Sequence, residues 1–204
     1  MIELTRDGDL WAVTLNRPEK ANSLTSEMLS RLIEIADEAA VGAKVLVLTG
    51  AGKVFSAGAD LDEARAGLAT SHLWEELSGK FAELPCLTIA ALNGTLAGGA
   101  FGMALACDIR ISDPSAKFFY PVMKLGFLPQ PSDPRRMREL IGPARAKMIL
   151  MGGQKILADE ALAWGLVDRI VDASEQKAAV EVLAGDALAA DLAHIAGIKA
   201  LITP

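Results

Sequence analysis

The pattern that most constrains the fold is an apolar strand followed by a glycine turn and a helix, and it occurs twice. The first copy begins at Val45 ("VLVLTGAGKVFSAGADLDEA") and the second at Leu87 ("LTIAALNGTLAGGAFGMALACD"). Apolar strands that alternate with helices are typical of a sheet whose strands are joined by helical crossovers. The chain is therefore predicted to have an α/β fold, with no internal linker.

The rest of the chain gives further elements. The alternating segment "IELTRDGDLWAVTLN" predicts a β-hairpin that turns at Asp7-Gly8-Asp9. The spacing of apolar residues from Met28 to Ala36 predicts a helix with Thr25 as its N-cap. Further strands are expected in "DIRISD", "KFFYP" and "LVDRIV". Further helices are expected from Gly98 to Ala106 and in "HLWEELSGKFAELP", "DPRRMRELIG", "ARAKMILMG" and "ADEALAWG", with a last helix from about Ser174.

The composition limits the kinds of partner and the cellular location that can be expected. The 204 residues are 51% hydrophobic and carry a net charge of −6 without a basic tract, so nucleic acid is not expected as a partner. The N-terminus lacks the pattern of a signal peptide, and no apolar run is long enough to span a bilayer. Cys86 and Cys107 lie in apolar runs, which indicates reduced core thiols and a cytoplasmic location. His72 and His194 have no neighbouring ligands, so no metal site is expected.

The two glycine turns are candidates for a binding site. Neither fits a nucleotide loop, because "GAGKVF" has no Ser or Thr after its Gly-Lys and "AGGAFG" lacks the dinucleotide-binding spacing. Either turn alone is explained by tight packing of a strand against a helix. As a pair on adjacent strands, they could aim two N–H groups at one oxygen, as in an oxyanion hole for a thioester that becomes an enolate.

At this point the chain resembles the crotonase superfamily, the enoyl-CoA hydratases and isomerases. The resemblance rests on "LNRPEKANSLTSEML", "VLVLTGAGKVFSAGADL", "IAALNGTLAGGAFGMALACDIRIS", "KLGFLPQPSDPRRMRELIG" and "ADEALAWGLVDRIV", in family order. It implies a spiral of ββα repeats over residues 1–172, with a C-terminal helical segment, residues 173–204, that is shorter than in relatives. It also implies a homo-trimer or a dimer of trimers.

The same resemblance implies site residues. The oxyanion-hole donors would be the backbone N–H groups of Ala59 and Gly99. An acyl-CoA substrate would be bound without a separate cofactor, and Lys20 is a cation placed to meet phosphate, although a solvated surface lysine is the alternative. The residues expected to line the acyl-CoA site are Lys20, Ala21, Ser23, Ala57, Gly58, Asp60, Leu61, Gly98, Pro121, Val122 and Leu125.

The acids that hydratases of this superfamily use are absent. Their two glutamates correspond to Gly102 and Val122, and the acid of one isomerase subgroup corresponds to Gln130. Addition of water needs a base and an acid, so an isomerase or a decarboxylase-like lyase is expected in preference to a hydratase. A non-catalytic acyl-CoA-binding or assembly protein is the alternative.

Two other residues are candidates for the proton-transfer group. Asp133 follows three residues after Gln130, and the favoured interpretation is that Ser132 or Asp133 caps the next helix. Tyr120 is a second candidate acid or hydrogen-bond donor, with a core aromatic as the alternative.

Overall fold

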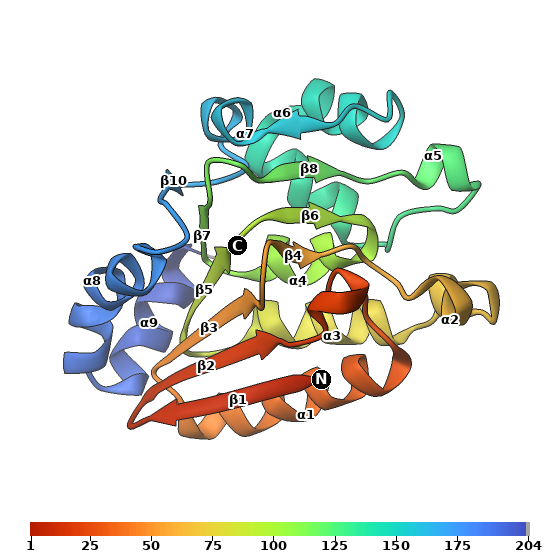
Figure 1. Cartoon of the computed structure of the whole chain (residues 1–204). Coiled ribbons are helices and arrows are strands. Elements are labelled where there is room, and N and C mark those ends of the chain that lie inside the picture. Colours follow the sequence, from red (N-terminus) through yellow and green to blue (C-terminus); the bar gives the residue numbers. More distant parts are fainter. Residues whose placement is uncertain (203–204) are drawn as a thin grey trace.

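The chain forms two sheets, and the larger one has six strands (Figure 1). The computed structural model describes residues 1–202, so the end of the predicted segment 173–204 lies outside the described residues. The six-stranded sheet has the order β1-β2-β3-β5-β7-β10, and only β1 and β2 are antiparallel. Its strands are β1 (Ile2–Asp7), β2 (Leu10–Leu15), β3 (Val45–Gly50), β5 (Leu87–Leu92), β7 (Ile109–Ser112) and β10 (Arg169–Ile170).

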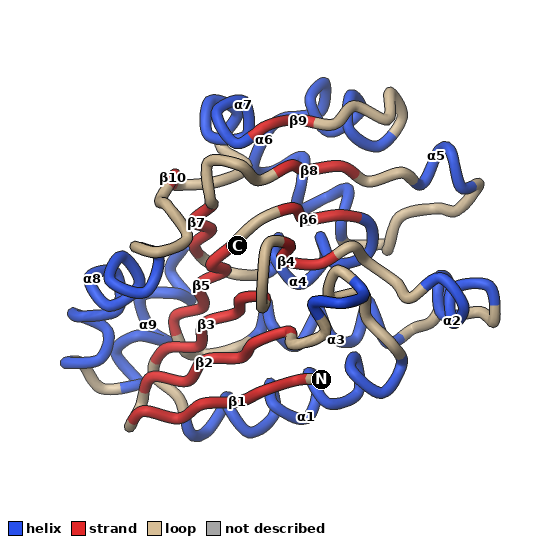
Figure 2. Tube along the Cα trace, in the orientation of Figure 1, coloured by secondary structure: helices blue, strands red, loops and turns tan. Residues whose placement is uncertain are grey.

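A four-stranded sheet lies beside the first, in the order β4-β6-β8-β9. Its strands are β4 (Val54–Ser56), β6 (Thr95–Ala97), β8 (Lys117–Phe119) and β9 (Ile156–Leu157). The chain steps from the larger sheet to the smaller one at β3–β4, β5–β6 and β7–β8, and Figure 2 shows these successive turns stacked on one another. The α/β class predicted from the sequence is therefore confirmed, as a spiral of ββα turns.

The predicted hairpin and first helix are present. Asp7 pairs with Leu10 across a two-residue turn in which Gly8 has φ +58, a conformation that glycine adopts without strain. Helix α1 (Ser26–Gly42) begins where the Thr25 hydroxyl accepts a 3.2 Å hydrogen bond from the Met28 N–H. Thr25 is thus the N-cap, as predicted.

Helices cover both faces of the larger sheet. On one face α1 packs on α3 (Leu73–Glu83), and α3 packs on α4 (Phe101–Ala106), over a core whose largest fully buried side chains include Phe55, Phe81, Phe101 and Phe118. On the other face α8 (Gln176–Ala189) packs on β3 and β5 through Val180 and Ala184. The connecting helices are α2 (Leu61–Arg65), α5 (Val122–Leu125), α6 (Asp133–Leu150), α7 (Ala158–Trp164) and α9 (Leu192–Ile202), with 3-10 turns η1 (Pro18–Lys20), η2 (Leu68–Thr70) and η3 (Gly98–Ala100).

Two predicted boundaries are wrong. The helix expected from Gly98 begins as the 3-10 turn η3 and becomes α-helical only at Phe101. The single helix expected from Ser174 is two helices, because the backbone of Ala190 is extended and ends α8.

The two helices expected in "DPRRMRELIG" and "ARAKMILMG" are present. They are the two halves of α6, and Gly142 separates them at a kink with the non-helical angles φ +79 and ψ 164.

Candidate active site

The two glycine turns touch each other. A Cβ at Gly58 would lie 2.9 Å from the Ala97 carbonyl oxygen and 3.4 Å from the Gly99 nitrogen, so only glycine permits this approach. Gly58 and Gly98 also have φ +91 and +57, which L side chains rarely adopt. The turns that the sequence singled out are therefore neighbours, although they are far apart along the chain.

The first turn is pinned on both sides of Ala59. The Leu24 N–H donates to the Gly58 carbonyl oxygen, and the Asp60 N–H donates to the Leu24 carbonyl oxygen, each at 2.8 Å. Within residues 1–202, no protein acceptor is found for the N–H of Ala59 or of Gly99. Both N–H groups thus remain available to an external acceptor.

Two adjoining cavities surround these N–H groups. A cavity of about 210 Å³ is lined by the glycine turns, by Trp74 and by the segment from Tyr120 to Gln130. A second cavity of about 320 Å³ is lined by η1 and α2 residues, and the two share Ala57, Ala59 and Leu61. The predicted site residues in the first are Ala57, Ala59, Leu61, Gly98, Gly99, Tyr120, Pro121, Val122 and Leu125. Those in the second are Lys20, Ser23, Ala57, Ala59, Asp60 and Leu61.

Two predicted residues act through the backbone alone. Ala21 has φ +51 and accepts a 3.0 Å hydrogen bond from the Ala57 N–H through its carbonyl oxygen. Neither Ala21 nor Gly58 is among the described residues that line these two cavities. They shape the loop and the turn that carry the lining residues.

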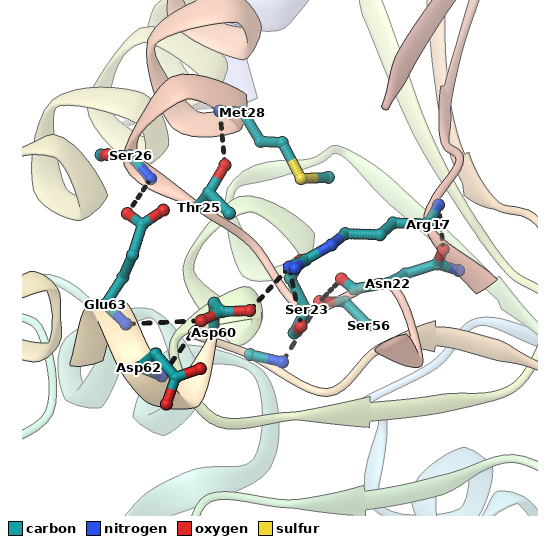
Figure 3. Close-up of polar contacts among 11 residues, drawn as sticks. Arg17, Asn22, Ser23, Thr25, Ser26, Met28, Ser56, Asp60, Asp62 and Glu63 are labelled. Atoms are coloured by element: carbon teal, nitrogen blue, oxygen red, sulfur yellow. Dashed lines mark hydrogen bonds and ion pairs between the residues drawn. The ribbon is translucent and has the colours of Figure 1, made fainter. Parts of the chain in front are cut away.

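Polar residues near the second cavity hold the loop before α1 (Figure 3). Arg17 Nη1 lies 2.8 Å from Asp60 Oδ2 and also donates to the Ser23 carbonyl oxygen at 3.1 Å. This hydrogen bond from Arg17 holds the pKa of Asp60 below its usual range. Asp60 Oδ1 accepts from the N–H groups of Asp62 and Glu63, which makes Asp60 the N-cap of α2.

Asn22 fixes the same loop from inside. Its amide donates to the carbonyl oxygens of Ala51 at 2.9 Å and Val54 at 2.7 Å, and its Oδ1 accepts from the Arg17 N–H at 2.8 Å. Arg17 and Asn22 were not among the residues predicted from the sequence. The signal that could have found Asn22 is its residue type, since asparagine adopts the left-handed conformation, here φ +52, more readily than most residues.

The favoured interpretation of Ser132 and Asp133 as side-chain caps is wrong. Ser132 is the residue before α6, but no side-chain cap hydrogen bond forms there. Pro134 in the first turn removes one N–H that a cap would bind. The Asp133 side chain instead points inward with 0% exposure, and its Oδ2 accepts a 2.9 Å hydrogen bond from the Tyr120 hydroxyl.

Burial governs the electrostatics of this pair. Burial raises the pKa of Asp133 to about 7, although the Tyr120 hydrogen bond and the Arg136 charge act in the opposite direction. Burial, followed by the Asp133 charge, also raises the pKa of Tyr120 far above its usual value. Asp133 Oδ1 is buried and has no hydrogen-bond partner among residues 1–202. Phe101 stacks on Tyr120 with ring centroids 5.5 Å apart.

A polar cluster that was not predicted from the sequence surrounds the start of α6. Arg136 Nη1 donates to Ser132 Oγ at 2.7 Å and to Ser78 Oγ at 3.0 Å. Glu75 Oε2 accepts from the Ser132 N–H at 3.2 Å and from its hydroxyl at 3.1 Å. The helical spacing of Glu75 with Ser78, and of Ser132 with Arg136, was the available signal, but nothing in the sequence joins α3 to α6.

The three positions where relatives carry acids, residues 102, 122 and 130, lie near Asp133 or on the wall of the 210 Å³ cavity. Gly102 is buried in α4 and faces Asp133. Val122 is buried at the start of α5, and Gln130 donates to the Ala69 carbonyl oxygen at 3.4 Å. Val122 and Gln130 line the 210 Å³ cavity.

Within residues 1–202, no three His, Cys, Asp or Glu side chains gather as a metal site would require. No helix in that range is both long enough and apolar enough to cross a membrane. Cys86 and Cys107 are free and buried, as predicted, and burial raises the pKa of their thiols to about 11 and about 12.

A family model and known proteins resemble this chain over most of its length. A family model described as enoyl-CoA hydratase/isomerase matches residues 5–202. The short-chain-enoyl-CoA hydratase of Clostridium acetobutylicum is 37% identical over 180 residues, which are 84% of this chain and 69% of that protein. The carnitinyl-CoA dehydratase of Salmonella enteritidis is 37% identical over 185 residues, 85% of this chain and 69% of that protein.

Solved structures agree with the sequence relatives. An enoyl-CoA hydratase/carnithine racemase from Magnetospirillum magneticum has a TM-score of 0.89 and 33% identity, covering 98% of this chain and 79% of that one. A putative enoyl-CoA hydratase/isomerase from Bordetella parapertussis has a TM-score of 0.91 and 30% identity, covering 100% and 86%. The chain therefore belongs to the enoyl-CoA hydratase/isomerase family of the crotonase superfamily.

Proposed function

We propose that this family enzyme forms an enolate from an acyl-CoA thioester and moves one proton with Tyr120 and Asp133, as an isomerase or a decarboxylase-like lyase. The observation that carries the proposal is the buried hydrogen bond between these two residues, because Tyr120 also lines the cavity that contains Gly99.

The thioester oxygen would accept from the Ala59 and Gly99 N–H groups. Charge grows on this oxygen as the enolate forms, so two fixed donors stabilise the transition state more than the substrate. Their lack of a protein acceptor and their position on the cavity wall support this role.

The nucleotide part of coenzyme A would lie in the 320 Å³ cavity. Lys20 and Arg65 line it and are cations suited to phosphate. Because this cavity shares Ala57 and Ala59 with the first, a ligand that fills both would carry its thioester past the two N–H groups.

Tyr120 and Asp133 would relay the proton. In one direction the Asp133 carboxylate takes the hydroxyl proton of Tyr120 while the phenol oxygen takes a proton from the acyl chain. In the reverse direction protonated Asp133 gives its proton to the phenol oxygen, and the hydroxyl proton goes to carbon. A pKa of about 7 lets Asp133 hold either form near neutral pH.

Hydration is not proposed, although the relatives include proteins named hydratases. It needs one group to activate water and another to protonate carbon. Gly102 and Val122 are non-ionisable, and Gln130 is an amide. Among the described residues that line the 210 Å³ cavity, Tyr120 alone is ionisable, and Asp133 lies behind it as its hydrogen-bond partner.

A non-catalytic acyl-CoA-binding protein is the second candidate. The observation that favours it is the burial of the Tyr120–Asp133 pair, since Asp133 is 0% and Tyr120 only 3% exposed.

We also propose that the protein is a homo-trimer, which the resemblance alone implies. Sedimentation of the purified chain tests this oligomeric state.

Exchange of acyl protons in deuterated water separates these candidates. A panel of acyl-CoA thioesters is incubated with the protein, and deuterium at Cα is measured by mass spectrometry. The enzyme is expected to exchange at least one thioester, and Tyr120→Phe, which keeps the ring, is expected to lower exchange by about 100-fold. Saturable binding of a thioester without exchange would favour the non-catalytic candidate.

A further inference from the structure

Gly102 occupies a position where glycine is not expected on local grounds. It is the second residue of α4 and is fully buried, and glycine is among the least favourable residues in a helix. Its φ is not in the left-handed region, so backbone conformation does not require glycine. The reason has to come from what surrounds it.

The surroundings are the carboxyl group of Asp133. A Cβ at residue 102 would lie 3.0 Å from Asp133 Oδ1 and 3.6 Å from Asp133 Oδ2, with Ser78 Cβ at 3.4 Å. By contrast, a Cβ at Gly79, in neighbouring helix α3, would meet nothing within 4 Å. Residue 102 is therefore confined by the Asp133 side chain in a way that Gly79 is not.

The Asp133 carboxyl group has little freedom to move away. Its Oδ2 is held by Tyr120, and the residue is 0% exposed. Its Oδ1 is buried and finds no partner in the described part of the chain. The charged groups that act on it are Arg136 of α6 and Glu75 of α3, while Gly102 is its neighbour from α4. Displacing the carboxyl group would lengthen or break its bond to Tyr120.

We infer that residues 102 and 133 share one carboxyl-sized space beside Tyr120, that Gly102 is the positioning residue that leaves it to Asp133, and that a carboxyl group attached at residue 102 can replace that of Asp133. The shared space follows from the contacts alone. The replacement rests on the proposed function, in which this carboxyl group exchanges a proton with Tyr120.

A double-mutant cycle on stability tests the shared space without any measurement of activity. Gly102→Ala is expected to lower the melting temperature of the native chain and to raise it in an Asp133→Ala background, where the carboxyl group is gone. Gly79→Ala is the matched control and is expected to raise the melting temperature by the same amount in both backgrounds. An equal rise with Gly102→Ala in both backgrounds would overturn the shared space.

Kinetics test the positioning role. Gly102→Ala keeps every proposed catalytic group, so we expect it to lower the rate of Cα exchange by up to about 100-fold at unchanged KM and to shift the pH profile of the remaining exchange. Gly79→Ala is expected to leave rate and profile unchanged. A Gly102→Ala protein with native rate and pH profile would contradict the role of Gly102.

A swap tests the replacement. Asp133→Gly is expected to lower exchange by about 100-fold, and Gly102→Glu added to it is expected to recover at least about tenfold. Gly102→Asp with Asp133→Ala is the second version of the swap, with a shorter side chain at residue 102. The replacement is overturned if the folded swaps recover nothing, and the shared space is overturned if neither swap folds. If Asp133→Gly alone leaves exchange intact, the proposed relay fails, whereas the stability coupling still reports on the space.

Discussion

Tyr120 and Asp133 stand 13 positions apart in the sequence, and a 2.9 Å hydrogen bond joins the hydroxyl of one to the carboxyl group of the other inside the molecule. The pair links β8, which ends at Phe119, to the first residue of α6. Because Tyr120 also lines the cavity beside the glycine turns, the bond connects a titratable buried group to the candidate site.

Asp133→Asn tests the proton-transfer role of this carboxyl group. Asparagine keeps the size of the side chain and can still accept the Tyr120 hydrogen bond, but it cannot ionise. We expect Cα exchange to fall by about 100-fold with the fold preserved, as judged by circular dichroism. Asp168→Asn is a control, since this partly exposed residue pairs with Arg110 away from the cavities, and full exchange in Asp133→Asn would eliminate the carboxyl group from the reaction.

The raised pKa of Asp133 predicts a pH-dependent stability. The pKa of this carboxyl group is near its usual value of 3.8 in the unfolded chain and about 7 in the folded protein. Between these values the folded state retains a proton that the unfolded state has lost, so the free energy of unfolding falls as the pH rises. This loss of stability is absent below about pH 4 and complete above about pH 7. At about 1.4 kcal/mol per pKa unit, it amounts to a few kcal/mol.

Urea unfolding of the native chain and of Asp133→Asn checks this sign. All other groups titrate in both proteins, so the difference between the two curves isolates residue 133. The native chain is expected to lose stability relative to the variant between pH 4 and pH 8. Parallel curves of unfolding free energy against pH would show that the folded protein does not hold Asp133 in its protonated form near neutral pH.

Gly99→Pro tests the proposed oxyanion donor. Proline removes the N–H, and loss of one such donor costs on the order of 100- to 1000-fold in rate. Any Cβ at this position also approaches Trp74 at 3.2 Å, so Gly99→Ala, which keeps the N–H, is the control. Exchange by folded Gly99→Pro at the rate of Gly99→Ala would remove Gly99 from the hole.

Hydration of crotonyl-CoA is expected to be very slow or absent. The reason is the non-ionisable lining at Val122 and Gln130 together with Gly102. The measurement is loss of the enoyl absorbance with purified protein, with a named hydratase of the family as the positive control. Rapid hydration would mean that Tyr120 and Asp133, or other groups, supply both the acid and the base.

Asn22→Ala is expected to lower the free energy of unfolding by about 3 kcal/mol, because it removes the hydrogen bonds of Asn22 to three partly buried backbone groups. Those groups are the carbonyl oxygens of Ala51 and Val54 and the N–H of Arg17. Lys20→Met is the comparison, since Lys20 is exposed and lines the second cavity. Lys20→Met is expected to weaken CoA binding, measured by calorimetry, and to leave the free energy of unfolding unchanged. A larger loss of stability in Lys20→Met than in Asn22→Ala would contradict these assignments.

Local patterns in the sequence determined most of the elements. Alternation and the Asp7-Gly8-Asp9 turn specified the hairpin, and apolar spacing with Thr25 specified α1, because these features act between residues a few positions apart. The recurrence of strand, glycine turn and helix specified the fold class. The family motifs then identified most of the residues that line the two cavities.

Tertiary structure alone decided what those residues face. Asp133 has the sequence context of a helix cap, but packing of α6 against α3 and α4 turns its side chain into the interior, where Tyr120 is its partner. The cluster of Glu75, Ser78, Ser132 and Arg136 forms for the same reason, from two helices that no local pattern relates. Side-chain burial depends on contacts between distant segments, and burial is what raises the pKa of Asp133 and makes its carboxyl group a candidate for proton transfer.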